Sequence, residues 1–317
     1  MYRVLVTGAS GFVGSATLEP LLERGCEIHC IGRTVPDLPG IVFHPLDLLV
    51  EDPAPRLRAI APTHLLHAAW HDDRKSIWDA PDNFLWTEAT LRLLRAFAQG
   101  GGRRVVVTGS AAEYSWEGPH LDERTTELAP ATRYGQAKRD LFLAMARSEF
   151  SDLSIGWGRL FWLFGPRDKP DKLLCHIIDA LAEGRPVRCT AGSQLRPFIY
   201  IEDAARALVA LLLSDVEGAV NIALEEVTSV RAIALSAARH FGADGAISFG
   251  EREMQSSEPA HLCATVDRLR CEVGYRAQYS VDRGVAVTVE RRASDMHNII
   301  LCQVSRSDPS AILNSMP

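Results

Sequence analysis

A glycine-rich segment joins the first apolar run of the chain to its first helical stretch. The run Arg3–Thr7 is typical of a buried strand, and Thr7-Gly8-Ala9-Ser10-Gly11-Phe12-Val13-Gly14 closes it. Glycines at such a corner allow a tight turn and let backbone N–H groups approach a pyrophosphate, toward which the helix N-terminus points. A turn needed for packing alone is the alternative, but its position after an N-terminal strand favours dinucleotide binding. The candidate cofactor-binding residues here are Gly8, Ser10, Gly11, Phe12, Val13 and Gly14.

Strand-like runs alternate with helical stretches through the first half of the chain. Before the fifth run lies the stretch Phe84–Gln99, in which Leu91, Leu94 and Phe97 fall on one helical face. Strands that alternate with helices indicate right-handed βαβ units and a parallel sheet. We therefore expect an α/β protein with a doubly wound parallel sheet, the Rossmann fold. The expected strands are Arg3–Thr7, Glu27–Ile31, Ile41–Pro45, His64–Ala68 and Arg104–Thr108.

The second half predicts a smaller α/β lobe. The apolar run Ile155–Phe164 ends in Gly165-Pro166-Arg167, as a buried strand does where the chain leaves a sheet. We expect a dinucleotide-binding domain over residues 1–165 and a substrate lobe over residues 166–292, partly interleaved with the first domain. Residues 293–317 are expected to form a tail of unknown structure, in which Met296–Val304 fits a short strand or a helix. The expected helices of this half are Leu173–Gly184, Ala204–Leu213 and Val230–Phe241.

The charge balance and the lack of long apolar runs narrow the class of partner. Lys and Arg number 34 against 40 Asp and Glu, a net charge of -6, and no basic run offers a surface for nucleic acid. No apolar stretch reaches membrane-spanning length and the N-terminus begins as a strand, so we expect a cytoplasmic protein without a membrane partner. The 7 cysteines are expected to be reduced thiols, and the 10 histidines show no metal-binding spacing.

The end of the second expected strand predicts the choice of nicotinamide cofactor. About 20 residues beyond such a glycine loop, an acid binds the ribose 2'-OH of NAD, and an arginine suits the 2'-phosphate of NADP. Gly32-Arg33-Thr34 offers an arginine and no acid. This favours NADP(H), with NAD(H) as the other cofactor that fits; a solvated loop cation is the alternative for Arg33. Further candidate cofactor contacts follow the third and fourth strands, at Asp47, Leu48, His67, Ala68 and Ala69.

A Tyr-x-x-x-Lys motif opens the helical run Tyr134–Ser148. The spacing puts Tyr134 and Lys138 on one helical face. A tyrosine titrates near about 10, and a neighbouring ammonium lowers its pKa by favouring the phenolate, so the pair predicts acid–base chemistry. The fifth strand leads to Ser110, at the sheet edge where ligands of open α/β folds bind. Each feature alone is common, but their combination behind a nucleotide loop indicates hydride transfer.

Together these motifs resemble the extended short-chain dehydrogenase/reductases, the family of NAD(P)-dependent nucleotide-sugar epimerases, dehydratases and reductases. The resemblance runs from Met1 to about Arg292. It rests on TGASGFVG (7–14), HAA (67–69), Ser110, YGQAK (134–138), RLFWLFGP (159–166) and QLRPFIYIED (194–203). It implies a catalytic triad, a nucleoside-diphosphate sugar bound in the second lobe, and a homodimer built through two helices per subunit. The implied triad is Ser110, Tyr134 and Lys138.

The chain departs from the family pattern at positions that set reaction and substrate. Dehydratases of the family carry an acidic pair where this chain has Ala111 and Ala112, and two methyl groups cannot move the protons that dehydration requires. Trp162 stands where members often have Asn, and Pro197 where they often have Asp, which predicts a more apolar sugar pocket. The candidate substrate-binding residues are Ser110, Ala111, Tyr134, Trp162 and Arg196, the last as partner of a substrate phosphate.

The surviving machinery predicts an NADPH-dependent reduction of the keto group of a nucleotide-activated 4-keto-6-deoxy sugar. The stretch around Trp70 and His71-Asp72-Asp73, with Trp86 and Glu113-Tyr114, is most similar to reductases of this kind. The main alternative is a nucleotide-sugar 4-epimerase, which uses the same triad but retains NAD. A non-catalytic dinucleotide sensor on the same fold is the distant alternative, which the intact triad disfavours because a sensor needs no proton relay.

Overall fold

The computed structural model describes residues 1–71, 77–253 and 259–307, and of residues 295–307 the helical backbone only. The chain divides into two compact units, each built from three separate stretches of sequence. Unit 1 comprises Met1–Leu163, Leu195–Val227 and Pro259–Gln278, and unit 2 comprises Phe164–Gln194, Thr228–Glu258 and Tyr279–Pro317.

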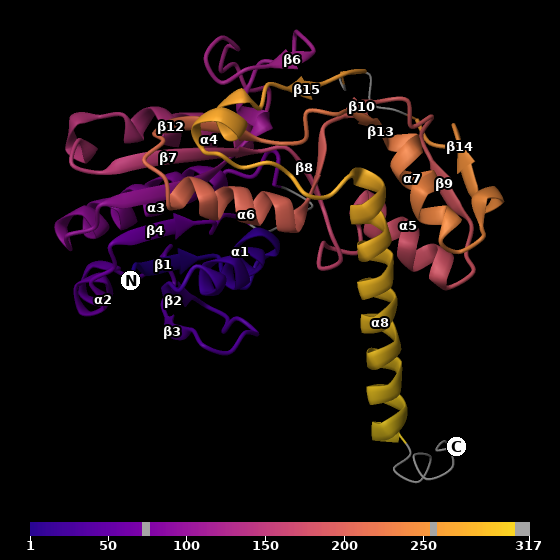
Figure 1. Ribbon diagram of the computed structural model, residues 1–317, viewed down its shortest axis with the longest axis horizontal. Coiled ribbons are helices and arrows are strands. Elements are labelled where there is room, and N and C mark those ends of the chain that lie inside the picture. The colour runs from indigo at the N-terminus through magenta and orange to yellow at the C-terminus, as the bar shows by residue number, and fades with distance from the viewer. Residues whose placement is uncertain (72–76, 254–258, 308–317) are drawn as a thin grey trace. The chain divides into compact units, whose positions relative to one another are not determined.

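A seven-stranded sheet forms the centre of unit 1, and all its neighbouring strands run parallel (Figure 1). The strand order is β12-β7-β5-β4-β1-β2-β3. Strands β2 and β3 are added on one side of β1, and all later strands of the sheet, from β4 on, are added on its other side. This confirms the predicted doubly wound α/β fold. The strands are β1 (Arg3–Thr7), β2 (Glu27–Gly32), β3 (Val42–Pro45), β4 (His64–His67), β5 (Arg104–Ser110), β7 (Ser154–Leu160) and β12 (Gly218–Ile222).

Side chains that alternate along these strands build two apolar cores, one on each face of the sheet. Leu5 packs on one face, while Val4 and Val6 pack on the other, as the pleat of a strand requires. Strands buried on both sides read as continuous apolar runs, which is why the sequence revealed them. The Leu5 face is covered by α2 (Ala54–Ile60), α3 (Asp82–Gln99) and α4 (Arg133–Met145); the other face is covered by α1 (Phe12–Glu23) and α6 (Ile201–Leu212).

The expected elements of the sheet are present, with small shifts at their ends. All five predicted strands form and end within two residues of the predicted positions. The run Ile155–Phe164 divides into β7 and the short β8 (Trp162–Phe164), because Phe161 turns from the sheet into a separate apolar cluster. Helix α1 continues through Pro20, which therefore removes one backbone hydrogen bond without ending the helix.

A smaller apolar cluster in unit 1 lies beyond the carboxyl end of β5. It gathers Ala111, Tyr114, Leu121 and Phe161 beneath the parallel pair β6 (His120–Leu121) and β15 (Cys263–Ala264). The remaining short strands of this unit are β10 (Leu195–Arg196) and β11 (Phe198–Tyr200).

Unit 2 is a small α/β assembly with its own long helix. Its helices are α5 (Leu173–Ala182), α7 (Val230–Arg239) and α8 (Val281–Ser307), and its strands are β9 (Val187–Cys189), β13 (Thr228–Ser229) and β14 (Ile247–Phe249). Arg292 of α8 holds Asp179 of α5 through Nε and Nη2 at 2.5 and 2.6 Å. Helix α8 passes through Met296–Val304, for which the sequence allowed a strand or a helix; residues 308–317 lie outside the described residues. Within the described residues, no helix combines the length and apolar character needed to cross a membrane.

Candidate active site

The glycine loop rests directly on the backbone that follows β4. Gly8 has a φ of 69°, and a Cβ there would lie 2.6 Å from the carbonyl carbon of Ala68 and the nitrogen of Ala69. A Cβ on Gly14 would lie 2.2 Å from the carbonyl oxygen of Gly8. Helix α1 then begins at Phe12, with Gly11 as its N-cap residue, without a side-chain cap and without an acid in its first turn. Such a cradle, which any side chain would fill, fits the pyrophosphate of a dinucleotide.

A directed chain of hydrogen bonds supports this loop from beneath. The amide of Ala69 donates to Thr7 Oγ1 at 3.3 Å, and Thr7 Oγ1 lies 2.7 Å from His67 Nδ1. His67 Nε2 lies 2.9 Å from Thr90 Oγ1, whose proton is donated to the carbonyl of Trp86 at 2.7 Å. Because Thr90 gives its proton to Trp86, His67 must donate from Nε2 and accept at Nδ1. One tautomer therefore satisfies every member of the chain.

His67 serves this site as a neutral, enclosed ring. It is fully buried, and burial together with the nearby Lys138 ammonium lowers its pKa to about 3. Both ring nitrogens are occupied by threonine hydroxyls, so the His67 side chain cannot also contact a cofactor. The sequence placed this residue among the cofactor contacts; the structure limits that role to the backbone of residues 67–69, against which the loop packs.

The three candidate adenosine contacts differ in what their side chains are free to do. Arg33 follows the end of β2 and is exposed. Asp47 closes a turn, accepting from the amide of Leu49 at 3.0 Å, and the side chain of Leu48 is buried in the core. Cofactor contacts from Arg33, Asp47 and Leu48 all stay predictions.

Ser110 ends β5 and caps a short 3-10 turn, Ala111–Glu113. Its Oγ accepts from the amide of Ala112 at 3.2 Å, and its side chain hydrogen-bonds Tyr134 of α4. Helix α4 reaches the turn because it has a glycine there: a Cβ on Gly135 would lie 2.2 Å from the carbonyl oxygen of Ala112. The structure thus brings Ser110 and Tyr134 together across two elements.

Tyr134 does not have the lowered pKa that its spacing from Lys138 predicts. Burial raises its pKa to about 12, with a smaller raising effect from the carboxylate of Glu113, while the hydrogen bond with Ser110 acts the other way. The ring stands edge-on to Trp78 and Trp70, with centroids at 5.6 and 6.5 Å. Tyr134 is therefore a protonated phenol at neutral pH in the protein by itself.

Lys138 lies one turn further along α4 and is almost completely buried. Its Nζ donates to the carbonyl of Thr108 at 2.8 Å and lies 3.6 Å from the centroid of the Trp70 ring. Burial lowers its pKa to about 7, although the carboxylate of Glu113 acts in the opposite direction. The Lys138 Nζ is thus directed to a strand carbonyl and an indole face. With a pKa of about 7 it carries no charge at the alkaline pH where Tyr134 loses its proton, so it does not lower the pKa of Tyr134.

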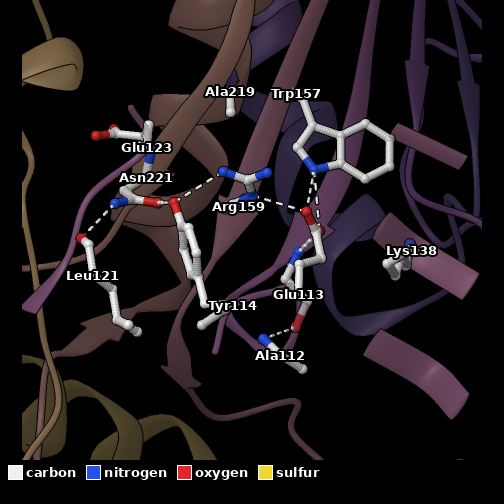
Figure 2. A network of polar contacts seen from close by, with 12 residues as sticks. Ala112, Glu113, Tyr114, Leu121, Glu123, Lys138, Trp157, Arg159, Ala219 and Asn221 are labelled. Carbon is white, nitrogen blue, oxygen red and sulfur yellow. Dashed lines mark hydrogen bonds and ion pairs between the residues drawn. The ribbon is translucent and has the colours of Figure 1, made fainter. Parts of the chain in front are cut away.

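A buried polar network surrounds the carboxylate of Glu113 (Figure 2), which also accepts from the backbone amide of Ser110. The carboxylate of Glu113 accepts from the indole Nε1 of Trp157 at 3.0 Å and from Arg159 Nε at 2.8 Å. Arg159 Nη1 donates to the Tyr114 hydroxyl at 2.9 Å, and that hydroxyl donates to Asn221 Oδ1 at 2.7 Å. The Glu113 and Arg159 side chains are 0% and 1% exposed. These hydrogen bonds offset much of the cost of burying the charged pair, although Arg159 Nη2 is buried without a hydrogen-bond partner among the described residues.

The sequence interpretation missed this network and most of the support beneath the loop. One signal was available: Ser110 followed three residues later by Glu113 is a capping box, in which each side chain binds the other's backbone amide. Trp70 follows the HAA motif directly and was noted only for resemblance. Asp72 and Asp73, singled out with it, lie outside the described residues.

The candidate substrate residues other than Ser110 and Tyr134 differ in their surroundings. Ala111 and Ala112 are buried. Trp162 is half-buried, with its ring 6.0 Å from that of Trp116. Arg196 is 1% exposed and donates to the carbonyls of Leu195 and Pro259 at 2.8 and 2.7 Å, with its guanidinium over Trp162. Its Nη1 and Nη2 thus bind backbone carbonyls here, and a phosphate contact from Arg196 stays a prediction.

Comparison with known proteins agrees with this geometry. A family model described as "NAD dependent epimerase/dehydratase family" matches residues 4–223. The UDP-glucose 4-epimerase of Mycolicibacterium smegmatis is 26% identical over 308 residues, covering 91% of this chain and 97% of that protein. The CDP-abequose synthase of Salmonella muenchen is 23% identical over 297 residues, covering 89% and 95%.

A solved structure extends the likeness to the fold. The UDP-glucose 4-epimerase of Thermus thermophilus, in complex with NAD, matches with a TM-score of 0.80 at 25% identity, covering 92% of this chain and 99% of that one. The family model spans well over half of the chain, and the glycine cradle and the Ser-Tyr-Lys grouping lie inside the matched residues. This chain belongs to the NAD dependent epimerase/dehydratase family.

Proposed function

We propose that this chain reduces the C4 keto group of a nucleotide-activated 4-keto-6-deoxy sugar with NADPH. One observation carries the proposal: Ser110 and Tyr134 are hydrogen-bonded at the carboxyl end of β5, while the two positions after Ser110 are the buried methyl groups of Ala111 and Ala112. This arrangement can relay one proton and can polarise one carbonyl. It offers no acid–base pair for eliminating water.

The roles of the three polar residues follow from what each can donate. The bound nicotinamide supplies the hydride that adds to C4. The hydroxyl of Ser110 donates to the carbonyl oxygen as negative charge grows on it. Tyr134 transfers its phenolic proton to the same oxygen, which becomes the product hydroxyl. Lys138, held by the Thr108 carbonyl, would bind the ribose hydroxyls of the cofactor.

In the cofactor-free protein, Tyr134 has the protonation state that a proton donor needs. Its pKa of about 12 keeps the phenol protonated at neutral pH. A protonated phenol can give its proton to a new alkoxide. It cannot take a proton from a sugar hydroxyl, the first step of an epimerase, until it has lost its own.

A nucleotide-sugar 4-epimerase is the second candidate, and the comparisons favour it. The relative from Mycolicibacterium smegmatis and the structure from Thermus thermophilus are both UDP-glucose 4-epimerases, and the latter holds NAD. An epimerase must retain its cofactor through the cycle, whereas a reductase exchanges it. Extraction of the purified protein separates the two functions: bound NAD at near-stoichiometric level supports the epimerase, and its absence supports the reductase.

The decisive experiment replaces Tyr134 by Phe. The change removes one oxygen and keeps the ring between Trp70 and Trp78. General acid–base catalysis contributes about 10²–10⁴-fold, so kcat should fall by that factor while the dissociation constant of NADPH stays within about threefold. Near-normal turnover by a folded Tyr134→Phe protein would show that the proton donor lies elsewhere.

We propose further that the protein is a cytoplasmic homodimer that pairs through α3 and α4. The outer faces of these packed helices carry apolar side chains in solvent: Leu85 of α3 and Leu143 of α4 are 58% and 54% exposed. Apolar groups of this size on neighbouring helices are typical of a subunit interface. Leu85→Glu with Leu143→Glu should give a monomer in analytical ultracentrifugation. Binding of the nucleotide sugar by unit 2 is likewise a prediction.

A further inference from the structure

We propose that Glu113 is a positioning residue for the reaction: its buried carboxylate holds the backbone amide of Ser110 and so directs the Ser110 hydroxyl toward the reacting oxygen. The inference rests on the proposed function, because it assigns to Ser110 the hydrogen bond to the substrate carbonyl. Glu113 supports the hydrogen bond from Ser110 to the substrate carbonyl, and it is not one of the three residues Ser110, Tyr134 and Lys138.

The hydroxyl of Ser110 has one orientation left for its proton. The amide of Ala112 donates to Ser110 Oγ, and the amide of Ser110 donates to Glu113 Oε1 at 2.6 Å. A serine hydroxyl has one proton and two lone pairs, so a lone pair held by Ala112 turns the O–H away from the turn. Tyr134 of α4 is the side chain that interacts with this hydroxyl.

Glu113 is itself held on all sides. Both of its carboxylate oxygens lie 3.0 Å from Trp157 Nε1, and Oε2 lies 2.8 Å from Arg159 Nε. The space above Gly109 is filled by this group: a Cβ on Gly109 would lie 2.1 Å from Trp157 Nε1 and 2.6 Å from Glu113 Oε1. The carboxylate cannot swing away, so its contact fixes Ser110 to a rigid strand, β7.

A structural cap alone would not need this charge. A neutral acceptor can cap a three-residue turn, whereas a buried carboxylate requires a buried Arg159 to tolerate it. A charged acceptor makes the shorter and stronger hydrogen bond to an amide. The same charge acts on α4, because the carboxylate raises the pKa of both Tyr134 and Lys138.

The titratable groups that face this cluster are few among the described residues. Arg159 faces Glu113 from β7, and Tyr114 faces Arg159 from the end of the 3-10 turn. Lys138 reaches the cluster from α4, and the neutral His67 faces Lys138 from β4. Because the Glu113 carboxylate raises the pKa of both Lys138 and Tyr134, loss of its charge should move the alkaline limb of the rate to lower pH.

Two double variants isolate the contact from the charge. Arg159→Met removes the guanidinium, so a neutral residue at 113 leaves no buried charge unpaired. In that background Glu113→Gln keeps an oxygen for the Ser110 amide, and Glu113→Met removes it. Tyr114→Phe is the control, because it breaks the same network beyond Arg159 without touching Ser110 or changing the charge of Glu113.

The two double variants should differ in rate and in protection of one amide. A displaced catalytic group can lower a rate by about 10²-fold, so single-turnover hydride transfer should be about 10- to 100-fold slower with Met at 113 than with Gln. NADPH should bind both within about threefold of each other, since neither touches the glycine loop. Hydrogen exchange at the Ser110 amide should be slow in wild type and with Gln, and fast with Met.

A third variant covers the case in which the double variants do not fold. Glu113→Asp keeps the negative charge beside Arg159, but it is one methylene too short to reach the Ser110 amide as well. It should slow hydride transfer like the Met variant, while the alkaline limb stays where the wild type has it.

The outcomes separate this inference from the proposed function. Equal rates for Gln and Met at 113, or a loss in Tyr114→Phe as large as in the Met variant, would overturn the role of Glu113. Full turnover by Tyr134→Phe would overturn the proposed function first. If Tyr134→Phe is inactive while the Gln and Met variants at position 113 have equal rates, the proposed function is retained and only the role of Glu113 is overturned.

Discussion

The ammonium of Lys138 lies 3.6 Å from the centre of the Trp70 ring and donates to the carbonyl of Thr108. The indole face and one strand carbonyl replace most of the water that an ammonium ordinarily holds. A cation over an indole is stabilised by about 0.5–2 kcal/mol, which offsets part of the cost of burial. The part of the burial cost that is not offset lowers the pKa of Lys138 to about 7, so Lys138 changes its charge within the neutral range.

Lys138 should give the stability of the protein a distinct dependence on pH. Its pKa is about 7 in the folded protein and 10.5 as the reference value. Between pH 7 and 10 the unfolded chain therefore binds a proton that the folded protein lacks. The free energy of unfolding should rise with pH across that window, by up to about 1.4 kcal/mol per unit. Lys138→Met should flatten this slope, as measured by urea unfolding at several pH values; an unchanged slope would contradict the assignment.

Gly135→Ala should separate Tyr134 from Ser110. The added Cβ would meet the carbonyl oxygen of Ala112 at 2.2 Å, so α4 must shift. Overpacking of this kind costs about 1–3 kcal/mol, although alanine ordinarily stabilises a helix relative to glycine. We expect a lower melting temperature and a kcat reduced by about 10- to 100-fold. Gln136→Ala, the next residue of the same helix, is the control and should change neither.

Arg33→Ala should reduce the preference for NADPH over NADH. The side chain is exposed at the end of β2, where an ion pair with the 2'-phosphate stays partly screened by water, so the expected change in the ratio of kcat/KM values is about tenfold. Arg24→Ala is the control. It removes an exposed arginine at the C-terminal end of α1, away from the glycine loop, and should leave the ratio unchanged. A wild type with equal efficiencies for both cofactors would show that NADP(H) was the wrong choice.

The protein should not dehydrate a nucleotide hexose. Ala111 and Ala112 are 4% and 7% exposed and carry no group that can remove a proton or expel a hydroxyl. Incubation with a nucleotide glucose and oxidised cofactor should yield no 4-keto-6-deoxy product by mass spectrometry. Robust turnover would place the acid and base on residues outside this turn.

The fold and the local motifs were predictable because they depend on spacing within single elements. A strand buried on both faces is apolar along its length, and so β1, β2, β4 and β5 were visible as runs. Tyr134 and Lys138 lie one helical turn apart, so their shared face follows from helix geometry whatever surrounds the helix. The capping box of Ser110 and Glu113 was visible in the same way, although the sequence alone did not reveal what Glu113 binds.

The tertiary structure determined which residues contact these motifs. Glu113 meets Trp157 and Arg159 because β7 pairs beside β5, and His67 meets Thr90 because α3 packs over β4. The pairing of strands far apart in sequence depends on the whole packing of the sheet, and no local period encodes it. The pKa of Tyr134 shows the consequence: its distance from Lys138 along the helix predicted a lowered value, and burial raised it to about 12. The sequence by itself predicted the grouping of Ser110, Tyr134 and Lys138. The tertiary structure determined the charge and the partners of these residues, because desolvation depends on everything packed around a group.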